Sequence, residues 1–225
     1  MLIRSGLIQN VDRIEAAAFG KHWREVHGPL AARLPNLRGY VQNHIVARGK
    51  SGGIPIHRID GISQLWFDDV GAMTVGMNSP ENDACIADIS GFLARVTLAI
   101  QDPGAWAGPI PGPAVVPAKV LAVYVGDGPV ADVEREAANA FAEQGPFPAR
   151  YRVNPVQRGT FIVDPSIARS EAPILAVVEA LLPDSDARER FLEAGLLGAA
   201  VPNASAEVLA VTPYVFIPPP ADSAH

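Results

Sequence analysis

The sequence has one cysteine, few basic residues and no long apolar run. Cys85 stands alone among 225 residues, which excludes an intrachain disulfide and suits a reducing cytoplasm. The 18 lysines and arginines form no cluster and are outnumbered by 24 aspartates and glutamates, for a formal net charge of -6. Because such a surface repels phosphate backbones and anionic lipids, we expect neither a nucleic-acid nor a membrane partner.

A membrane-spanning helix and an export signal are not expected either. No stretch reaches the roughly 18 consecutive apolar residues that a transmembrane helix needs. The apolar start of the chain meets Asp12 too early to supply the core of a signal peptide, so a cytoplasmic location is expected. With 48% hydrophobic residues, the chain can bury a sizeable core as one large domain or two small ones.

Hydrophobic periodicity predicts six elements in the first hundred residues. Asp12 is a candidate cap for the first helix, which must kink or restart at Pro29 because proline has no amide hydrogen. Ser79 and Pro80 are typical of the start of the second helix. The expected order is strand 2–9, a helix after Asp12, strand 37–48, strand 61–68, helix 79–93 and strand 94–100.

The same order is expected a second time after a segment rich in proline and glycine, 102–117. The expected elements are strand 119–125, helix 132–144, strand 149–159, strand 172–181, helix 184–195 and strand 206–216. Tyr40 and Asn43 recur as Tyr151 and Asn154 at the same spacing. A β-α-β-β-α-β order is that of a ferredoxin-like unit, so the chain is predicted to contain two of them.

The predicted fold class is therefore α+β, with two fused ferredoxin-like units forming a pseudo-dimeric α+β barrel. The units span 1–101 and 118–217, joined by the 102–117 linker and followed by a flexible tail, 218–225. Helices on one side of each four-stranded sheet leave the other side bare, and two bare sides can bury each other. We expect the pocket between the two sheets. A fused pair of this kind need not dimerise further, although a homodimer is possible.

His27 is the leading candidate for chemistry. It precedes Gly28-Pro29, where the helix is expected to end, and a histidine there can exchange a proton with an acidic carbon. The alternative is a histidine that only interacts with the helix dipole. His22 lies five positions earlier, about 140° away around an α-helix, so the two are not expected to share a metal.

Strand 37–48 carries further polar candidates on one side. Tyr40, Gln42 and His44 alternate along it, with Arg48 in the same phase, and are expected to face the barrel interior. Tyr40 would then polarise a carbonyl and His44 would act as a second acid or base. The alternative is that Tyr40 and His44 pack in the interface between the halves, because the repeat of Tyr40 as Tyr151 suggests architecture.

The next strand adds two candidates for substrate binding. Asp60 lies beside His57 and could orient an imidazole, although Asp-Gly before a strand is also a turn signal. Trp66 could stack on an aromatic substrate, although packing in the core is the commoner role. Cys85 lies in an apolar-faced helix and is interpreted as a packing residue.

Three motifs together resemble the EthD family of the dimeric α+β barrel superfamily. They are HWREVHGPLAARLPNLRGYVQNH (22–44), RIDGISQLWFDDVGAM (58–73) and SPENDACIADISGFLARVTLAI (79–100). The resemblance covers residues 1–100 and is weaker over 118–217. That second half has no His-Gly-Pro, and Pro155 takes the place of His44. It resembles a repeat that has lost its polar site.

The resemblance implies a fold more strongly than a reaction. EthD relatives include cofactor-independent isomerases of methylmuconolactones and dehydratases and cyclases of aromatic polyketide pathways, and the superfamily includes quinone-forming monooxygenases and haem proteins. We expect cofactor-free, metal-free proton transfer on a small carbonyl, lactone or aromatic polyketide-like compound. His27, Tyr40 and His44 would be catalytic, and Gln42, Asp60, Trp66 and Arg48 would bind substrate. The alternatives are a cofactor-free monooxygenase, a non-catalytic ligand-binding protein and a haem protein.

Overall fold

The structure is a computed structural model that describes residues 1–109, 118–142, 147, 149–158, 172–198 and 201–220. The first half of the chain has the expected alternation, with one more helix than the sequence predicts. Its elements are β1 (Leu2–Asn10), α1 (Ala16–His22), the π-helical turn η1 (Trp23–His27), α2 (Gly28–Ala31), β2 (Gly39–Arg48), β3 (Gly61–Phe67), α3 (Val70–Met77), α4 (Pro80–Ile89) and β4 (Leu93–Gln101).

The second half repeats the order with two helices. Its elements are β5 (Ala118–Gly126), α5 (Val130–Ala140), β6 (Arg150–Pro155), β7 (Ile174–Leu182), α6 (Ser185–Ala194) and β8 (Ala204–Ile217). The expected linker is described only over 102–109, where Ala107 and Tyr151 exchange backbone hydrogen bonds. The rest of the linker, 110–117, and the end of the expected tail, 221–225, lie outside the described residues.

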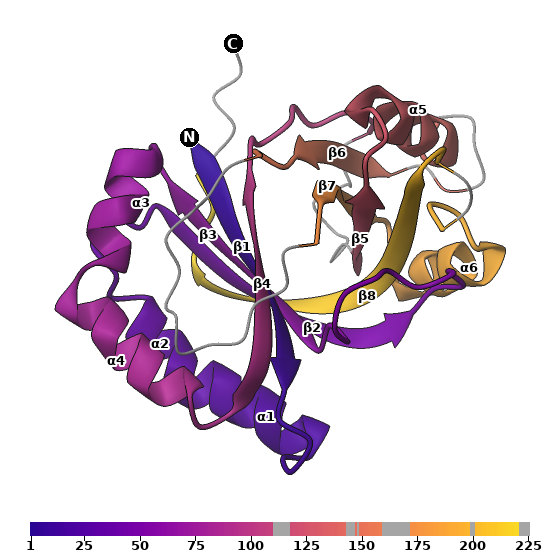
Figure 1. Ribbon diagram of the computed structural model, residues 1–225. Helices are drawn as coiled ribbons and strands as arrows, with labels where there is room; N and C mark the ends of the chain where they lie inside the picture. The colour runs from indigo at the N-terminus through magenta and orange to yellow at the C-terminus, as the bar shows by residue number, and fades with distance from the viewer. Residues whose placement is uncertain (110–117, 143–146, 148, 159–171, 199–200, 221–225) are drawn as a thin grey trace.

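All eight strands form one antiparallel sheet in the order β4-β1-β3-β2-β8-β5-β7-β6. Its two edges meet, because Gln101 and Val156 form an antiparallel bridge. The sheet is therefore curled into a barrel-like shape, with the helices of each half on its outside (Figure 1). This confirms the predicted α+β class and its two βαββαβ-like halves.

The repeated tyrosine and asparagine occupy equivalent places in the two halves. Tyr40 on β2 packs toward the helices of its half, and Tyr151 on β6 packs against Phe141 beneath α5. Asn43 and Asn154 point the other way and are fully buried. The sequence repeat is therefore also a spatial repeat of β2 and β6.

The interior of the curled sheet is filled with side chains. One layer is apolar and draws on both halves, with Leu7 and Ile62 against Leu121, Val123 and Leu209. A second layer is polar and buried. Lys119 Nζ lies 2.5 Å from Glu179 Oε1 and donates to Gln64 Oε1 at 2.9 Å, and Arg152 donates to Glu179 Oε2 at 2.7 Å. These side chains join the two halves.

The helix-covered side of the second half is tightly packed. Phe141 stacks on Phe191 at 5.1 Å between ring centroids, and Phe147 meets Phe191 edge-on at 5.5 Å. All three rings are buried. Aromatic side chains therefore fill the described part of this helix-covered side.

The additional helix of the first half, α3, begins after Asp69, whose side chain accepts a hydrogen bond from the Ala72 amide. Asp-Asp after a strand is a capping signal that the sequence analysis did not use. α4 begins as predicted, with Ser79 as its N-cap. No helix among the described residues is both long and apolar enough to cross a membrane.

Candidate functional site

The helix that carries the histidines does not break at Gly28-Pro29, contrary to the expectation. Gly28 has φ -55° and ψ -51°, and its amide donates to Trp23 O, five residues back. A single widened π-turn accommodates the proline that follows, which has no amide hydrogen and would crowd an α-helical turn. Gly28 is needed for space instead, since a Cβ there would lie 2.1 Å from Phe216 Cζ.

The π-turn brings His22 and His27 to one side of the helix. Residues five apart diverge by about 140° on an α-helix, but an i→i+5 bond makes them neighbours. Both rings also contact Phe92, at 4.8 Å and 5.5 Å between centroids. The α-helical argument that separated the two histidines was therefore wrong.

One carboxylate on α4 binds both histidines. His22 Nε2 lies 2.8 Å from Asp88 Oδ1, and His27 Nδ1 lies 3.0 Å from Asp88 Oδ2. An ionised carboxylate only accepts, so Nδ1–H of His27 donates and its Nε2 is left as the basic nitrogen. Burial would raise the pKa of Asp88, but hydrogen bonds from His27 and His22 bring this pKa below its usual value. Asp88 is thus ionised at neutral pH.

His27 lines a cavity of about 560 Å³ between the first-half sheet and its helices. Its walls come from β1, β3 and β4 on one side and from η1, α2, α3 and α4 on the other. Most lining side chains are apolar: Ile8, Trp23, Ala31, Leu34, Leu65, Met73, Met77, Ile86, Ile89, Leu93, Val96 and Leu98. Gly6 and Ser63 form part of the floor, so small residues leave room there. This volume suits a small organic ligand.

The cavity lies on the helix side of the sheet, whereas the sequence analysis expected it between the two sheets. Tyr40, Gln42 and His44 also face the helices. The Tyr40 ring packs with Ala31 and Met73, and Gln42 Nε2 donates to Trp23 O at 2.7 Å. Val41 packs inside the barrel instead. The expected orientation of β2 was therefore inverted.

Tyr40 is a second polar group in the cavity, and its hydroxyl proton is free to be donated. Gln42 Nε2 donates to the Tyr40 hydroxyl oxygen at 2.8 Å, which leaves the hydroxyl hydrogen available. Burial raises the pKa of Tyr40 above its usual value, so the phenol stays protonated. Gln42 does not line the cavity, and its effect on a ligand is exerted through Tyr40.

Several other polar residues of the cavity are already occupied. Thr74 Oγ1 donates to Val70 O, Asn78 Nδ2 to Thr74 O, and Asn82 Nδ2 to Met77 O, so all three already bind backbone carbonyls of α3. Burial raises the pKa of Cys85 to about 11, which keeps a neutral, weakly nucleophilic thiol in the wall. Ser63 Oγ accepts from the Gly6 amide, and the carboxylate of Asp83 is exposed. Among the other described lining residues, His27, Tyr40 and Arg4 carry the groups that remain for a ligand.

His44 does not line the cavity. It lies between Trp23 and Tyr214, at 4.5 Å and 4.6 Å between ring centroids, and its Nε2 bonds Gln42 Oε1 at 3.1 Å. Burial, and then the charge of Arg24, lower the pKa of His44 to about 4. His44 is therefore a neutral packing residue near the site, closer to the alternative that the sequence left open.

This arrangement predicts a pH effect on stability. Folded His44 stays neutral while the unfolded residue takes up a proton near pH 6.5, so the free energy of unfolding should fall as pH drops from about 6.5 toward 4. His44→Gln cannot titrate and should lose less stability over that window. Urea unfolding of both proteins at about pH 7 and pH 5 measures the difference. Equal losses in the two proteins would contradict the assignment.

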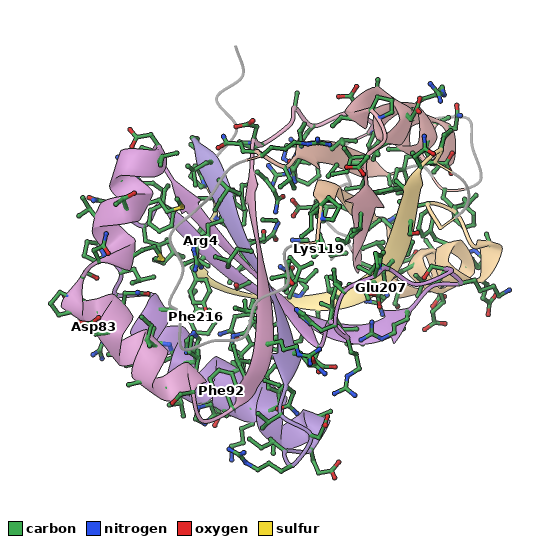
Figure 2. All side chains as sticks on the ribbon, in the orientation of Figure 1. Arg4, Asp83, Phe92, Lys119, Glu207 and Phe216 are labelled. Carbon is green, nitrogen blue, oxygen red and sulfur yellow. The ribbon has the colours of Figure 1, made fainter. Side chains whose placement is uncertain are left out.

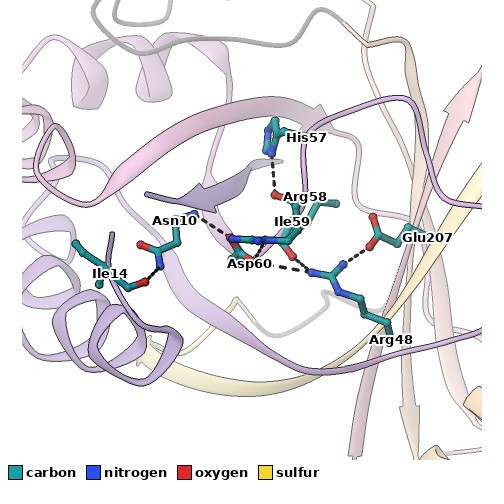
Figure 3. Close-up of polar contacts among 8 residues, drawn as sticks. All are labelled: Asn10, Ile14, Arg48, His57, Arg58, Ile59, Asp60 and Glu207. Atoms are coloured by element: carbon teal, nitrogen blue, oxygen red, sulfur yellow. Dashed lines mark hydrogen bonds and ion pairs between the residues drawn. The ribbon is translucent and has the colours of Figure 1, made fainter. Parts of the chain in front are cut away.

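Arg48 and Asp60 lie away from the cavity, among the polar contacts of Figure 3. Arg48 forms an ion pair with Glu207 and bonds Ile59 O, and Asp60 accepts from the Asn10 amide at 3.0 Å. His57 bonds Thr97 Oγ1 at 3.0 Å, and no bond joins it to Asp60 in the described part of the chain. Trp66 packs inside the barrel with Ile3 and Val41.

Of the seven residues predicted from the sequence, only His27 and Tyr40 line the cavity. Asp88 and Arg4 were missed. For Arg4 a signal existed, because it is the single charge in a strand whose other residues of the same phase are Leu2, Gly6 and Ile8. For Asp88 the sequence holds no such signal. Helix α4 carries three acidic side chains, and only the π-turn determines which of them binds the two histidines.

Comparison with known families agrees with the fold. Residues 12–95 match the family model described as the EthD domain, which spans His27, Tyr40 and Asp88. No curated protein matches the chain. An EthD family protein from Bacillus halodurans is 23% identical over 45% of this chain and 98% of its own, with a TM-score of 0.37.

Two solved structures are similar along nearly the whole chain. An anthrone oxidase-like protein has a TM-score of 0.60 at 8% identity, covering 99% of this chain and 96% of its own. A protein from Fusobacterium nucleatum that is provisionally named a monooxygenase has a TM-score of 0.51 at 10% identity, covering 93% and 91%. These likenesses show a shared α+β barrel fold.

Proposed function

Because the first half of this chain is an EthD domain, we propose that the protein is a cofactor-independent enzyme that moves a proton on a carbonyl compound in this cavity. The observation that supports this most is the Asp88–His27 pair, because His27 lines a mainly apolar cavity of about 560 Å³ and Asp88 binds its Nδ1. A histidine held by a carboxylate is a common form of general base.

The proposed reaction begins with a substrate seated between the sheet and α4. His27 Nε2 takes a proton from the carbon next to the carbonyl, and the electron pair of the C–H bond moves into an enolate. The Tyr40 hydroxyl donates to the oxygen that gains charge, and Asp88 stabilises the imidazolium. Return of the proton to another carbon gives an isomer, and loss of a β-hydroxyl as water gives a dehydration product.

The apolar walls favour this chemistry. Hydrogen bonds to a developing charge are stronger where water is excluded, and most of this cavity is lined by aliphatic and sulfur-containing side chains. Tyr40 is held in place by Gln42 from one side and by the Phe216 ring, stacked at 5.0 Å, from the other. A donor fixed before the reaction need not reorganise as charge develops.

The Asp88→Asn variant tests the pair. Asparagine keeps the shape but can present a donor to His27 Nδ1, which favours the wrong tautomer, so we expect turnover to fall about a hundredfold to ten-thousandfold. Hydrogen–deuterium exchange at the carbon next to the ketone of tetralone, in deuterium oxide, gives the rate.

His22→Gln is the matched control for that variant. His22 binds the other oxygen of Asp88 and has a side chain that is 37% exposed, so its loss leaves the Asp88–His27 bond in place. We expect a change of only a few-fold. Equal losses in Asp88→Asn and His22→Gln would mean that Asp88 acts only by holding α4 against the helix.

A second function shares the first step. The carbanion that His27 leaves would bond to dioxygen instead of regaining a proton, and the hydroperoxide formed would lose water to give a new carbonyl group, as in a cofactor-free oxygenase. The fold likeness to an anthrone oxidase-like protein supports this reading. An oxygen electrode with anthrone as substrate separates the two functions. Oxygen uptake that needs His27 would favour the oxygenase, and deuterium exchange without uptake would favour proton transfer alone.

A further inference from the structure

Arg4 projects from the middle of β1 into an otherwise mainly apolar surface. It shares the helix-facing side of the strand with Leu2 and Ile8. Its neighbours in the sheet are Leu65 on β3 and Ile100 on β4, both buried and apolar. Neither neighbouring strand offers a carboxylate at this level. The guanidinium lines the cavity together with Tyr40 and Cys85.

The side chain of Arg4, which is partly exposed, forms no hydrogen bond and no ion pair with any residue that the structure describes. Burial lowers the pKa of Arg4 to about 10, so the group is still a cation at neutral pH. Asp83 is the one carboxylate on the cavity wall within the described ranges, and it is exposed and unbonded to Arg4. The thiol of Cys85 is neutral and provides no counter-charge.

A partly buried cation that has no partner is unfavourable for folding. Charged side chains that leave water normally gain an opposite charge or several hydrogen bonds. Elsewhere in this chain that rule holds, since buried Lys119 and Arg152 both bind Glu179. Arg4 is the exception, and its free donors face a space large enough for a ligand. The missing partner is therefore expected to come from the ligand.

From this arrangement we propose that Arg4 anchors the carboxylate of an anionic substrate, an aromatic or alicyclic acid whose reacting carbon lies toward His27. The reaction at that carbon rests on the proposed function, whereas the anion site does not. One guanidinium with no second cation beside it suits a single negative charge, and its planar donors match a carboxylate in a two-point contact.

The separation between Arg4 and His27 limits the shape of this substrate. His27 contacts Phe92, and Phe92 packs with Ile8. Ile8 lies four residues from Arg4 along β1, and at the usual rise of a strand the backbones of these two residues are about 13 Å apart. Figure 2 shows Arg4 and Phe92 toward opposite ends of the space between the sheet and the helices. Tyr40 lies two strands from Arg4 in the same row, across Leu65. The carboxylate and the carbonyl are therefore at different ends of the ligand.

Binding of naphthalene carboxylate, compared with its neutral carboxamide, tests the anion site without any reaction. Isothermal titration on the whole protein should show the carboxylate bound more tightly. In Arg4→Met the affinity for the carboxylate should fall about tenfold to a hundredfold while that for the amide stays the same. Arg38→Met is the matched control, because Arg38 is exposed and pairs with Asp68 outside the cavity, and it should change neither affinity.

Stability provides a second readout that a structural arginine would not give. Removal of an unpaired, partly buried charge should leave the melting temperature of Arg4→Met unchanged or higher than that of the wild type. An unchanged ratio of carboxylate to amide affinity in Arg4→Met would overturn the proposal, as would a wild type that binds neither compound. If the protein binds the carboxylate through Arg4 but does not catalyse deuterium exchange in tetralone, the anion site stands and the proposed reaction is wrong.

Discussion

Replacement of His27 by glutamine is expected to reduce deuterium exchange of tetralone about a hundredfold to ten-thousandfold. The variant keeps a polar side chain of similar length at the cavity wall, but it has no basic nitrogen to accept the proton. Binding of naphthalene carboxylate should change little, because the proposed anion site lies at the far end of the cavity. Exchange rates from nuclear magnetic resonance and affinities from titration separate the two effects.

His44→Gln is the matched control for His27. It makes the same substitution in the same half of the chain, on a histidine that lies outside the cavity. Exchange should stay within a few-fold of the wild type at neutral pH. If His44→Gln lost as much activity as His27→Gln, or if His27→Gln kept full activity, the base would have to be sought elsewhere.

Replacement of Glu179 by glutamine is expected to lower the free energy of unfolding by about 3–5 kcal/mol. Glu179 is 5% exposed inside the curled sheet and binds two cations, Lys119 at 2.5 Å and Arg152 at 2.7 Å. Without its charge, the buried Lys119 and Arg152 lose the carboxylate that both of them bind. Urea unfolding at neutral pH measures the loss, provided that the variant unfolds in a single transition.

A triple variant separates charge from packing in that prediction. Lys119→Met, Glu179→Leu and Arg152→Met together remove all three charges of this network as the structure describes it, so stability should return toward the wild-type value. Asp68→Asn is the surface control, because its pair with Arg38 is exposed and should matter by less than about 1 kcal/mol. A Glu179→Gln variant as stable as Asp68→Asn would contradict the account of the barrel interior.

Acid should weaken the same network. Burial alone would raise the pKa of Glu179, but Lys119 and Arg152 hold this pKa below its usual range. An acid whose folded pKa is depressed stabilises the fold above its unfolded pKa, near 4.3, and this contribution is lost as pH falls from there toward the folded value. The wild type should therefore lose stability below about pH 4 more steeply than the triple variant.

Much of the fold could be predicted because its signals are local. The eight strands fall close to their predicted ranges, and the recurrence of Tyr40 and Asn43 as Tyr151 and Asn154 indicated the repeat before any contact was known. Asp69 is an equally local signal, an N-cap residue after a strand. The predicted element order did not include it and therefore lacked α3. The barrel-like curvature followed from the family resemblance and from the need to bury two bare sheet faces.

The side of β2 that carries the site could not be predicted in the same way. Both sides of this strand are buried and both carry polar residues, Gln42 on one and Asn43 on the other. The alternation of side chains then indicates a strand, but it does not indicate which side of the strand faces the helices. Only the contacts decide, with Gln42 bonded to Trp23 O under the helix and Asn43 bonded to Gln64 inside the barrel.

The partners of His27 depended on a helical detail that the sequence shows only faintly. An α-helix would have separated His22 from His27, and Asp88 is one of several acids on α4. The π-turn before Pro29 places both histidines on that one carboxylate. A proline preceded by glycine within an otherwise regular helical pattern was the available hint, and it was interpreted as a break.

The crystal structure of the protein with bound tetralone, carrying a carboxylate on its aromatic ring opposite the ketone, tests the central claim most directly. We expect the ligand beneath α3 and α4, with its carboxylate on Arg4, its ketone oxygen near the Tyr40 hydroxyl and the adjacent carbon within about 3.5 Å of His27 Nε2. A ligand bound inside the curled sheet, or one in the cavity with its acidic carbon turned away from His27, would contradict it.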